Sequence, residues 1–222
     1  MKKSNPLFIL IVILVPLLII TSGMRIALSP IFFNLEYRLP NFPPDSFGFT
    51  LSDRLQWADF SIDFISGRVD ENTFRTASFP DGTQLFNERE IAHMIDVRNL
   101  TVIMLWVWRI LMVIFLLSYF YTKREGISHL FLTALGFGAK ITIGIILAIL
   151  LFLAINFNQL FTAFHRIFFE GDTWLFYISD TLIRLFPLKF WQDLFIFIGG
   201  FSLAASICLL LLSAKRSLIK RA

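Results

Sequence analysis

The stretch Ile141–His165, ITIGIILAILLFLAINFNQLFTAFH, contains no charged residue over 25 positions when its histidine is neutral. The hydrocarbon core of a bilayer is about 30 Å thick and needs about 20 apolar residues per helix. Two further uncharged runs of 21 residues, Ser4–Met24 and Leu194–Ala214, reach this length, and Asn99–Thr122 is apolar except for Arg109. The sequence therefore predicts four transmembrane helices, at about 5–24, 100–121, 141–161 and 194–214.

The composition agrees with a membrane protein. Hydrophobic residues make up 56% of the 222 positions, charged residues 16%, and phenylalanine alone occupies 27 positions. A soluble domain of this size has too little interior to bury so much apolar surface, and disordered chains are polar and poor in aromatic residues. We therefore predict an all-α membrane protein in which residues 1–222 form a single membrane-embedded domain.

Several classes of function are excluded by what the sequence lacks. Cys208 is the single cysteine, so the chain has no intramolecular disulfide, and thiol–disulfide exchange and cysteine-rich zinc sites are excluded. No phosphate-binding glycine motif, HExxH pattern or GxSxG elbow occurs. The formal net charge is only +4, and we expect no nucleic-acid partner.

The basic residues beside the predicted spans indicate the orientation in the membrane. If the four helices alternate, one side receives Lys2, Lys3, Lys123, Arg124, Lys215, Arg216, Lys220 and Arg221. Only Glu125 among the 16 acidic residues joins them. Since positive charge marks the cytoplasmic side, we expect both termini in the cytoplasm and two outward segments, at about 34–98 and 161–193.

An alternative interpretation of the N-terminus is a cleaved secretory signal peptide. Two lysines followed by an apolar stretch fit either interpretation. No small-x-small cleavage site follows Ile20, and the apolar run is long for a signal peptide. A retained first helix is therefore the favoured prediction, and cleavage would leave the topology of the other helices unchanged.

The first outward segment is predicted to fold into a small extracytoplasmic subdomain. Thr50 and Asp53 have the spacing of a capping box, and Gly67 is suited to end the helix that they begin. Apolar residues recur at helical spacing between them, at Leu51, Leu55, Ala58, Ile62 and Ile65. After this amphipathic helix, the turn Pro80–Gly82 predicts a short β-hairpin. Asn87 and Glu90 then form a second N-cap pair, which starts a helix continuing into the second span.

The second outward segment is rich in aromatic residues, including Trp174 and Trp191, which suit the boundary between membrane and water. Its apolar residues Leu175, Ile178, Leu182 and Leu185 recur at helical spacing. We therefore predict an interfacial helix that lies flat on the membrane until Pro187.

Two of the three histidines are expected at the same depth. His93 lies six residues before the second span and His165 at the outer end of the third, whereas His129 falls on the cytoplasmic side. They form either a shared site or two ordinary interfacial histidines. Near-neutral imidazoles beside carboxylates are suited to acid–base catalysis.

Four charged residues are candidates to support such a site. Glu90 and Asp96 are each three residues from His93 and could hold its imidazole in one tautomer, although both could instead be solvated acids and Glu90 a helix cap. Asp180 could serve His165 in the same way. Arg109, inside the second span, is either functional or a buried arginine that pairs with carbonyls or a carboxylate.

Two stretches resemble the lipoprotein intramolecular transacylase (Lit) family. They are GTQLFNEREIAHMIDVRNL, from Gly82 to Leu100, and FHRIFFEGDTWLFYISDTLIRLFPLKFWQDLF, from Phe164 to Phe195. The four-span plan is similar too, so the resemblance covers most of the chain. Arg98 is a departure, because a lysine is expected there.

The resemblance implies an enzyme of lipoprotein maturation in the bacterial cytoplasmic membrane, with its active site at the outer face. Such an enzyme moves the sn-2 acyl chain of a diacylglyceryl-modified N-terminal cysteine to the α-amine of the same cysteine. The two catalytic histidines of the family map onto His93 and His165. The expected partners are the lipoprotein N-terminus and membrane lipid, and the oligomeric state is left open.

Histidine can move the protons of this reaction without a metal or a cofactor, and we expect neither. Three alternatives remain open at this point. A metal could be bound by the two histidines with Asp96 or Asp180, the protein could be a non-enzymatic scaffold that presents its outward subdomain to a partner, or it could act on another lipid ester.

Overall fold

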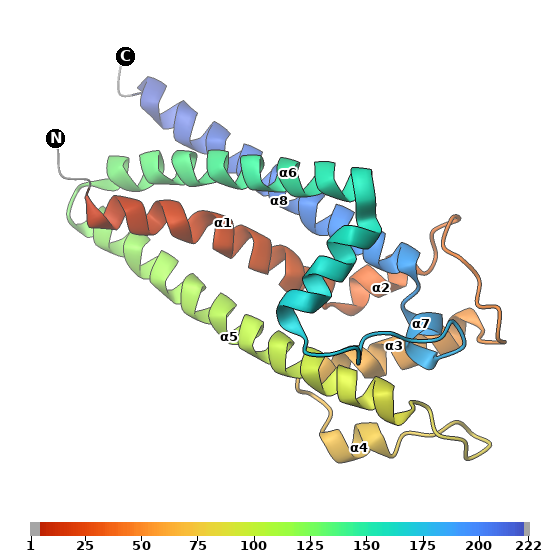
Figure 1. The fold of residues 1–222 in the computed structure, drawn as a ribbon. Helices are drawn as coiled ribbons and strands as arrows, with labels where there is room; N and C mark the ends of the chain where they lie inside the picture. The colour runs from red at the N-terminus through yellow and green to blue at the C-terminus, as the bar shows by residue number, and fades with distance from the viewer. Residues whose placement is uncertain (1–4, 220–222) are drawn as a thin grey trace. The chain divides into compact units, whose positions relative to one another are not determined.

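The computed structural model describes the backbone of residues 5–219 and the side chains of residues 5–214. Within this range the regular structure is all helical, with no β-strand, so the all-α part of the predicted fold class is confirmed. In chain order (Figure 1) the helices are α1 (Pro6–Ala27), α2 (Pro30–Glu36), α3 (Leu51–Ile65), α4 (Glu71–Arg75), α5 (Glu88–Arg124), α6 (Ser128–Phe168), α7 (Thr181–Leu185) and α8 (Leu188–Ile219).

Four helices are long and apolar enough to cross a membrane, and each contains one of the predicted spans. They are α1, α5, α6 and, over its described side chains, α8. α5 begins at Glu88, so the capping pair at its start and the second span do belong to one continuous helix of 37 residues. The basic side chains of Lys2, Lys3, Lys215, Arg216, Lys220 and Arg221 lie outside the described side chains.

The chain divides into two compact units. The first comprises the described parts of Met1–Arg25, Leu105–Phe152 and Ile196–Ala222, and the second comprises Ile26–Met104 and Leu153–Phe195. A single domain over the whole chain stays a prediction.

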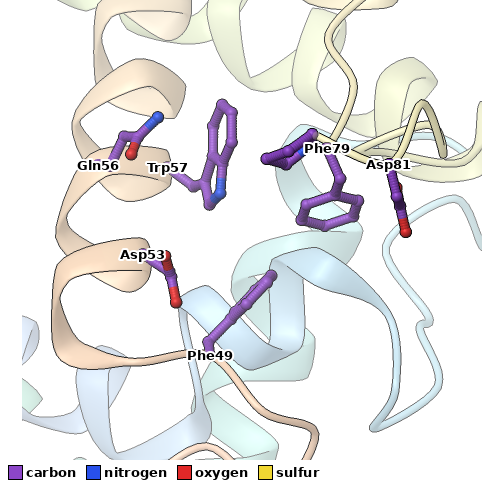
Figure 2. A pocket seen from close by; sticks show the side chains of 7 residues that line it. Phe49, Asp53, Gln56, Trp57, Phe79 and Asp81 are labelled. Atoms are coloured by element: carbon purple, nitrogen blue, oxygen red, sulfur yellow. The ribbon is translucent and has the colours of Figure 1, made fainter.

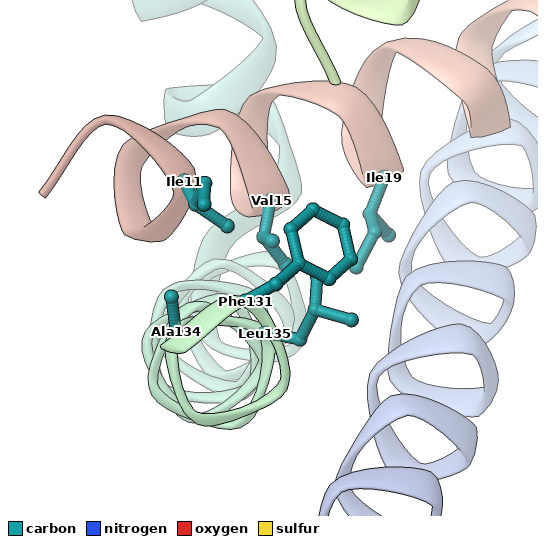
Figure 3. Packing of buried hydrophobic residues seen from close by; sticks show 6 residues of the cluster. All are labelled: Ile11, Val15, Ile19, Phe131, Ala134 and Leu135. Atoms are coloured by element: carbon teal, nitrogen blue, oxygen red, sulfur yellow. The ribbon is translucent and has the colours of Figure 1, made fainter. Parts of the chain in front are cut away.

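The core of the first unit lies between α1 and α6. Apolar side chains from one face of α1 pack against those of the first turns of α6 (Figure 3), and the cluster consists of Ile11, Val15, Ile19, Phe131, Ala134 and Leu135. Further along α6, Gly138 lets α1 approach closely, because a Cβ atom there would lie 2.6 Å from the Cβ of Val15. The missing side chain therefore sets the distance between these helices locally.

In the second unit, α3 begins and ends as its sequence predicts. The side chains of Thr50 and Asp53 form a reciprocal capping box. After Ile65 the chain turns at Gly67, whose φ of +79° is the left-handed conformation that glycine adopts without strain. The Arg68 amide then donates to the carbonyl of Asp63 at 2.8 Å, which closes the helix end.

The predicted β-hairpin after α4 is not formed as a pair of strands in the described chain. Only an isolated antiparallel bridge joins Ser78 to Gln84 around the predicted turn. Two backbone hydrogen bonds flank the bridge, from the Phe79 amide to the Thr83 carbonyl at 2.8 Å and from the Leu85 amide to the Ala77 carbonyl at 2.9 Å. The Thr83 amide donates to the Asp81 side chain at 2.9 Å, so the pairing does not extend into two strands.

The predicted interfacial helix is much shorter than its apolar spacing suggested, since only Thr181–Leu185 is helical. Before it, the segment turns at Gly171, and the Asp180 carboxylate accepts a hydrogen bond from the Tyr177 amide at 2.8 Å. Leu175 and Ile178, which were expected on the apolar side of this helix, lie in the non-helical segment before it and are exposed. Side-chain bonds to the backbone have therefore stabilised turns where periodicity alone predicted helix.

α6 is bent at Asn156, whose φ of −155° and ψ of 84° lie outside the helical region. The side chain of Asn156 accepts a hydrogen bond from the Gln159 amide at 3.0 Å. This is the bond that an N-cap residue makes, so the last part of α6 starts afresh after the bend. That part carries His165.

Candidate active site

His93 and His165 come together in the second unit. Their ring centroids are 6.0 Å apart and the rings are inclined by only 21°. Both side chains are buried, with exposed fractions of 7% and 5%. His93 is contributed by the second turn of α5 and His165 by the last turn of α6. The structure thus pairs the two histidines that the sequence placed at one depth.

The ring of His165 is oriented by its own helix. Its Nδ1 atom lies 2.8 Å from the carbonyl oxygen of Phe161, one turn earlier. A carbonyl can only accept, so Nδ1 carries the proton in this bond. In a neutral imidazole the lone pair is then on Nε2, which is free to accept a proton.

Aromatic rings enclose His165. The centroid of the Phe161 ring is 4.1 Å from that of His165, and the rings of Trp174, Phe169 and Phe164 follow at 4.8, 5.5 and 5.6 Å. Sequence reasoning assigned this aromatic segment to the membrane boundary and missed these contacts. The spacing of Phe161, His165 and Phe169, four residues apart along α6, is the signal that predicts part of them.

His93 faces the same enclosure. The rings of Phe169 and Phe176 approach it edge-on, with centroids at 5.0 and 5.4 Å. Its Nδ1 atom is buried and has no hydrogen-bond partner in the described chain. A buried polar atom without a partner is costly, and it is typical of a functional site that a substrate completes.

Glu90 supports the site through the backbone. It is 1% exposed, its Oε2 accepts from the Asn87 amide at 2.8 Å, and its Oε1 accepts from the Leu182 amide at 2.7 Å. The predicted N-cap pair of Glu90 and Asn87 is therefore confirmed. The second bond links the start of α5 to α7, 92 residues later in the chain. Glu90 does not hold Nδ1 of His93, which has no partner.

The other predicted supporting residues form no hydrogen bond with either histidine in the described chain. Asp96 is exposed on α5. Asp180 accepts hydrogen bonds from the Tyr177 amide and from the side chain of Asn87, at 2.8 and 3.2 Å. Asp180 therefore stabilises the segment that precedes α7. It can influence the two histidines only through the position of that segment.

Arg109 belongs to the first unit, where it is exposed on α5. Its guanidinium carbon lies 4.7 Å from the centroid of the Trp106 ring, three residues earlier. The alternative of a buried arginine is therefore wrong.

Among the described residues no group of three or more His, Cys, Asp or Glu side chains is placed to hold a metal ion.

Comparisons with known proteins show which family the chain belongs to. A model of the family described as "Lipoprotein intramolecular transacylase Lit" matches residues 8–191. An uncharacterized protein from Aquifex aeolicus (strain VF5) is 30% identical over 211 residues, covering 91% of this chain and 90% of the relative.

Solved structures share the fold. The structure of the membrane integral lipoprotein intramolecular transacylase Lit from Bacillus cereus has a TM-score of 0.79 at 23% identity, over 97% of this chain and 95% of that one. A variant of the same Bacillus cereus protein with one histidine replaced by arginine has a TM-score of 0.74 at 22% identity, over 97% and 92% of the two chains. With four helices suited to span a bilayer, the chain is a multi-pass membrane protein. It belongs to the lipoprotein intramolecular transacylase (Lit) family.

Proposed function

We propose that this protein moves the sn-2 acyl chain of a diacylglyceryl-modified lipoprotein to the α-amine of the same N-terminal cysteine, with His93 and His165 as the proton-transfer groups. The observation that carries the proposal is the pairing of two buried imidazoles, 6.0 Å apart between centroids, in a chain of this family. The product is a lyso-form lipoprotein.

The reaction needs two proton transfers. The amine nitrogen attacks the ester carbonyl, the new C–N bond forms, and the bond between the carbonyl carbon and the sn-2 oxygen breaks. The amine loses a proton and the departing glyceryl oxygen gains one, so no external reactant is consumed. A pair of imidazoles, one accepting and one donating, matches this requirement.

The hydrogen bond of His165 supports its assignment as the base. With the proton of Nδ1 directed to Phe161, the lone pair of Nε2 is available to the attacking amine. His93 is then the group that stabilises the departing oxygen. Its buried, unpartnered Nδ1 atom supports a polar contact that forms only when substrate is bound.

The aromatic enclosure supports transfer to an amine over hydrolysis. The rings of Phe169, Phe176 and Trp174 leave little room for water beside the imidazoles. A site that excludes water protects the ester until the amine attacks, and it strengthens the electrostatic contacts inside. We place this site at the outer face of the bacterial cytoplasmic membrane with both termini in the cytoplasm, because the basic residues favour that orientation.

The test is tandem mass spectrometry of a lipoprotein's N-terminal peptide, from cells with and without this protein. Because the transfer is intramolecular, the intact mass does not change, and the measurement must locate the acyl chain by fragmentation. We expect an N-acyl cysteine with a monoacylglyceryl thioether only when the protein is present. A matched assay with an amine-reactive reagent should lose its signal as the amine becomes acylated.

Two outcomes would contradict the proposal. One is an unchanged diacyl peptide with a free amine in cells that contain well-inserted protein, which would favour a scaffold. The other is a lyso-peptide with a free amine and released fatty acid, which would show a lipase. Cys208→Ala is the control variant, since this free thiol lies in the first unit and is expected to leave the activity unchanged.

A further inference from the structure

A cavity of about 400 Å³ lies in the second unit, away from the residues that contact the histidines. One wall is the first half of α3 with the residue before its cap, and the other is the turn after α4 (Figure 2). The residues that line it include Phe49, Asp53, Gln56, Trp57, Phe79 and Asp81.

Three aromatic rings line the cavity from different directions. The centroids of Trp57 and Phe79 are 6.1 Å apart with the rings at 85°, and those of Phe49 and Phe79 are 5.8 Å apart at 46°. Figure 2 shows Trp57 on α3 directed toward Phe79 on the turn. Rings set at such angles present π-faces on more than one side, which is the arrangement that binds organic cations.

Two carboxylates complete the cavity, one on each wall. Asp53 accepts bonds from Thr50 through Oδ2 only, and Asp81 accepts bonds from Thr83 through Oδ1 only. These bonds hold the pKa of each carboxyl below its usual range, so both are ionised at neutral pH. Each carboxylate therefore keeps acceptor capacity beyond these bonds, which is available to a ligand.

A neighbouring contact in the same unit shows how an aromatic ring and a carboxylate together bind a cation. The guanidinium carbon of Arg184 lies 3.5 Å from the centroid of Phe49, and the charge of Arg184 is matched by Asp45, with two hydrogen bonds of 3.1 Å. The side chain of Asp45 is almost wholly buried in this pair. Arg184 is therefore compensated by Asp45 and already covers one face of Phe49, so Trp57 and Phe79 are the rings left to a ligand. No basic residue is among those that line the cavity beside Asp53 and Asp81.

We propose that this cavity binds a lysine or arginine side chain from the polypeptide of the lipoprotein substrate; this rests on the proposed function. The aromatic rings would take the aliphatic stem and the face of the cation, and Asp53, Asp81 and Gln56 would accept its N–H groups. A zwitterionic lipid headgroup fits less well, because its phosphate would approach two carboxylates, and the nearby Arg184 is already paired with Asp45.

The first experiment measures binding without catalysis. Purified full-length protein in a neutral maltoside detergent is titrated calorimetrically with an unlipidated, N-acetylated peptide that carries two lysines, and with the same peptide carrying two glutamines. We expect binding of the lysine peptide only. Asp81→Asn should weaken it about two- to fivefold, as expected for one lost ion pair at an exposed carboxylate, and Trp57→Leu by at least as much.

Matched variants separate this site from the histidine pair. Asp59→Asn, at an exposed carboxylate on the same helix that does not line the cavity, should bind as wild type does. His93→Ala and His165→Ala should also bind normally, whether or not the proposed function is correct. If a variant of Asp53 unfolds because the cap of α3 is lost, Asp81→Asn still decides, since Asp81 is exposed in a turn.

The second experiment uses diacylglyceryl-cysteine peptides with lysine or glutamine at the following positions. We expect the wild type to prefer the lysine peptide through a lower KM with a similar kcat. Asp81→Asn should lose most of this preference through a higher KM and keep its kcat. Equal binding of both unlipidated peptides, or binding unaffected by Asp81→Asn and Trp57→Leu, would overturn the assignment. Direct binding of phosphoethanolamine that Trp57→Leu weakens, with no binding of the lysine peptide, would assign the cavity to a lipid headgroup instead.

Discussion

Nδ1 of His165 donates its proton to the carbonyl oxygen of Phe161 across 2.8 Å, one turn earlier on α6. His165 lies in the last turn of the part of α6 that restarts after Asn156. The bond fixes the tautomer without a carboxylate partner. The ring of Phe161 lies against the same imidazole, so one residue both orients and shields it.

The histidine pair should be essential, and its two members should not act independently. His93→Ala and His165→Ala should each lower transacylation by about 10²- to 10⁴-fold, the usual contribution of a general acid or base. If both act in one transition state, the double variant should be little worse than either single variant. The measurement is the rate of conversion of a diacyl lipopeptide by purified protein.

His129→Ala is the matched control, because His129 is exposed at the other end of α6. It should retain wild-type activity. Every variant must first be shown to insert into the membrane, since an unfolded protein would give the same loss. Folded, inserted variants without His93 or His165 that still form the lyso-product would refute the mechanism.

Glu90 should be required for stability and for the shape of the site. In Glu90→Gln one of two acceptor oxygens becomes an amide that cannot accept from the Asn87 or Leu182 backbone. A buried backbone amide left without its charged partner costs about 1–3 kcal/mol. We expect a lower unfolding temperature and a lower kcat, because the released segment before α7 carries Phe176, which packs on His93.

Glu88→Gln is the control for this change. Glu88 lies two residues earlier and is 81% exposed, with a 3.4 Å ion pair to Arg75 that contributes little at a surface. Its replacement should leave the unfolding temperature and the activity near wild type. A loss in Glu88→Gln as large as that in Glu90→Gln would mean that charge at the start of α5, rather than the two buried hydrogen bonds, matters.

The long helices and their caps were predictable because their determinants are local. Apolar runs long enough to cross a bilayer core predict α1, α5, α6 and α8, and reciprocal side-chain bonds at Thr50–Asp53 and Asn87–Glu90 follow from spacing alone. The positions of His93 and His165 relative to the ends of their spans likewise predicted that the two residues lie at the same depth.

What could not be predicted depends on partners distant in the sequence. The Leu182 amide, which binds Glu90, is 92 residues away, and no periodicity encodes that bond. The segment before α7 has the spacing of a helix, yet the Asp180 side chain stabilises a turn at Tyr177 instead. The bend at Asn156 was also missed, although an asparagine inside an apolar helix is a candidate cap once tertiary contacts allow it.

The orientation in the membrane can be tested directly. A reporter that is active only outside the cytoplasm should be active when fused after Gly67 or Gly171 and inactive when fused after Glu125. The physical reason is the excess of lysine and arginine at the expected cytoplasmic ends. The opposite pattern would put both histidines on the side without lipidated cysteines, and it would contradict the proposed function and the charge argument together.

The contact of α1 with α6 predicts a sharp difference between two glycines of α6. In Gly138→Ala the new Cβ would lie 2.6 Å from Cβ of Val15 and 3.0 Å from the Val12 carbonyl oxygen, so a helix must shift. Overpacking of this kind costs about 1–3 kcal/mol. In Gly144→Ala the new Cβ meets nothing within 4 Å, and the better helix former should leave stability equal or raise it. Thermal unfolding of both variants in one detergent compares them, and equal unfolding temperatures would contradict the close packing.

Glu36 is buried at the end of α2, with 4% of its surface exposed. Burial raises the pKa of its carboxyl to about 8, and the carboxyl of Asp193, which can share a proton with it, adds to the rise. Lys189, paired with Asp193 on α8, opposes the shift. The folded protein therefore holds a proton on Glu36 that the unfolded chain releases at much lower pH.

The stability of the folded state should accordingly fall as pH rises between about 4.5 and about 8. In that interval the folded state binds more protons than the unfolded state, so the free energy of unfolding decreases with pH, and above it the contribution is lost. Glu36→Gln, which is neutral at every pH, should flatten this part of the unfolding-temperature profile and stabilise the protein most at the alkaline end. Glu88→Gln, at an exposed position, should keep the wild-type profile. A Glu36→Gln profile parallel to that of the wild type would mean that Glu36 is already ionised in the folded protein, with Lys189 outweighing its burial.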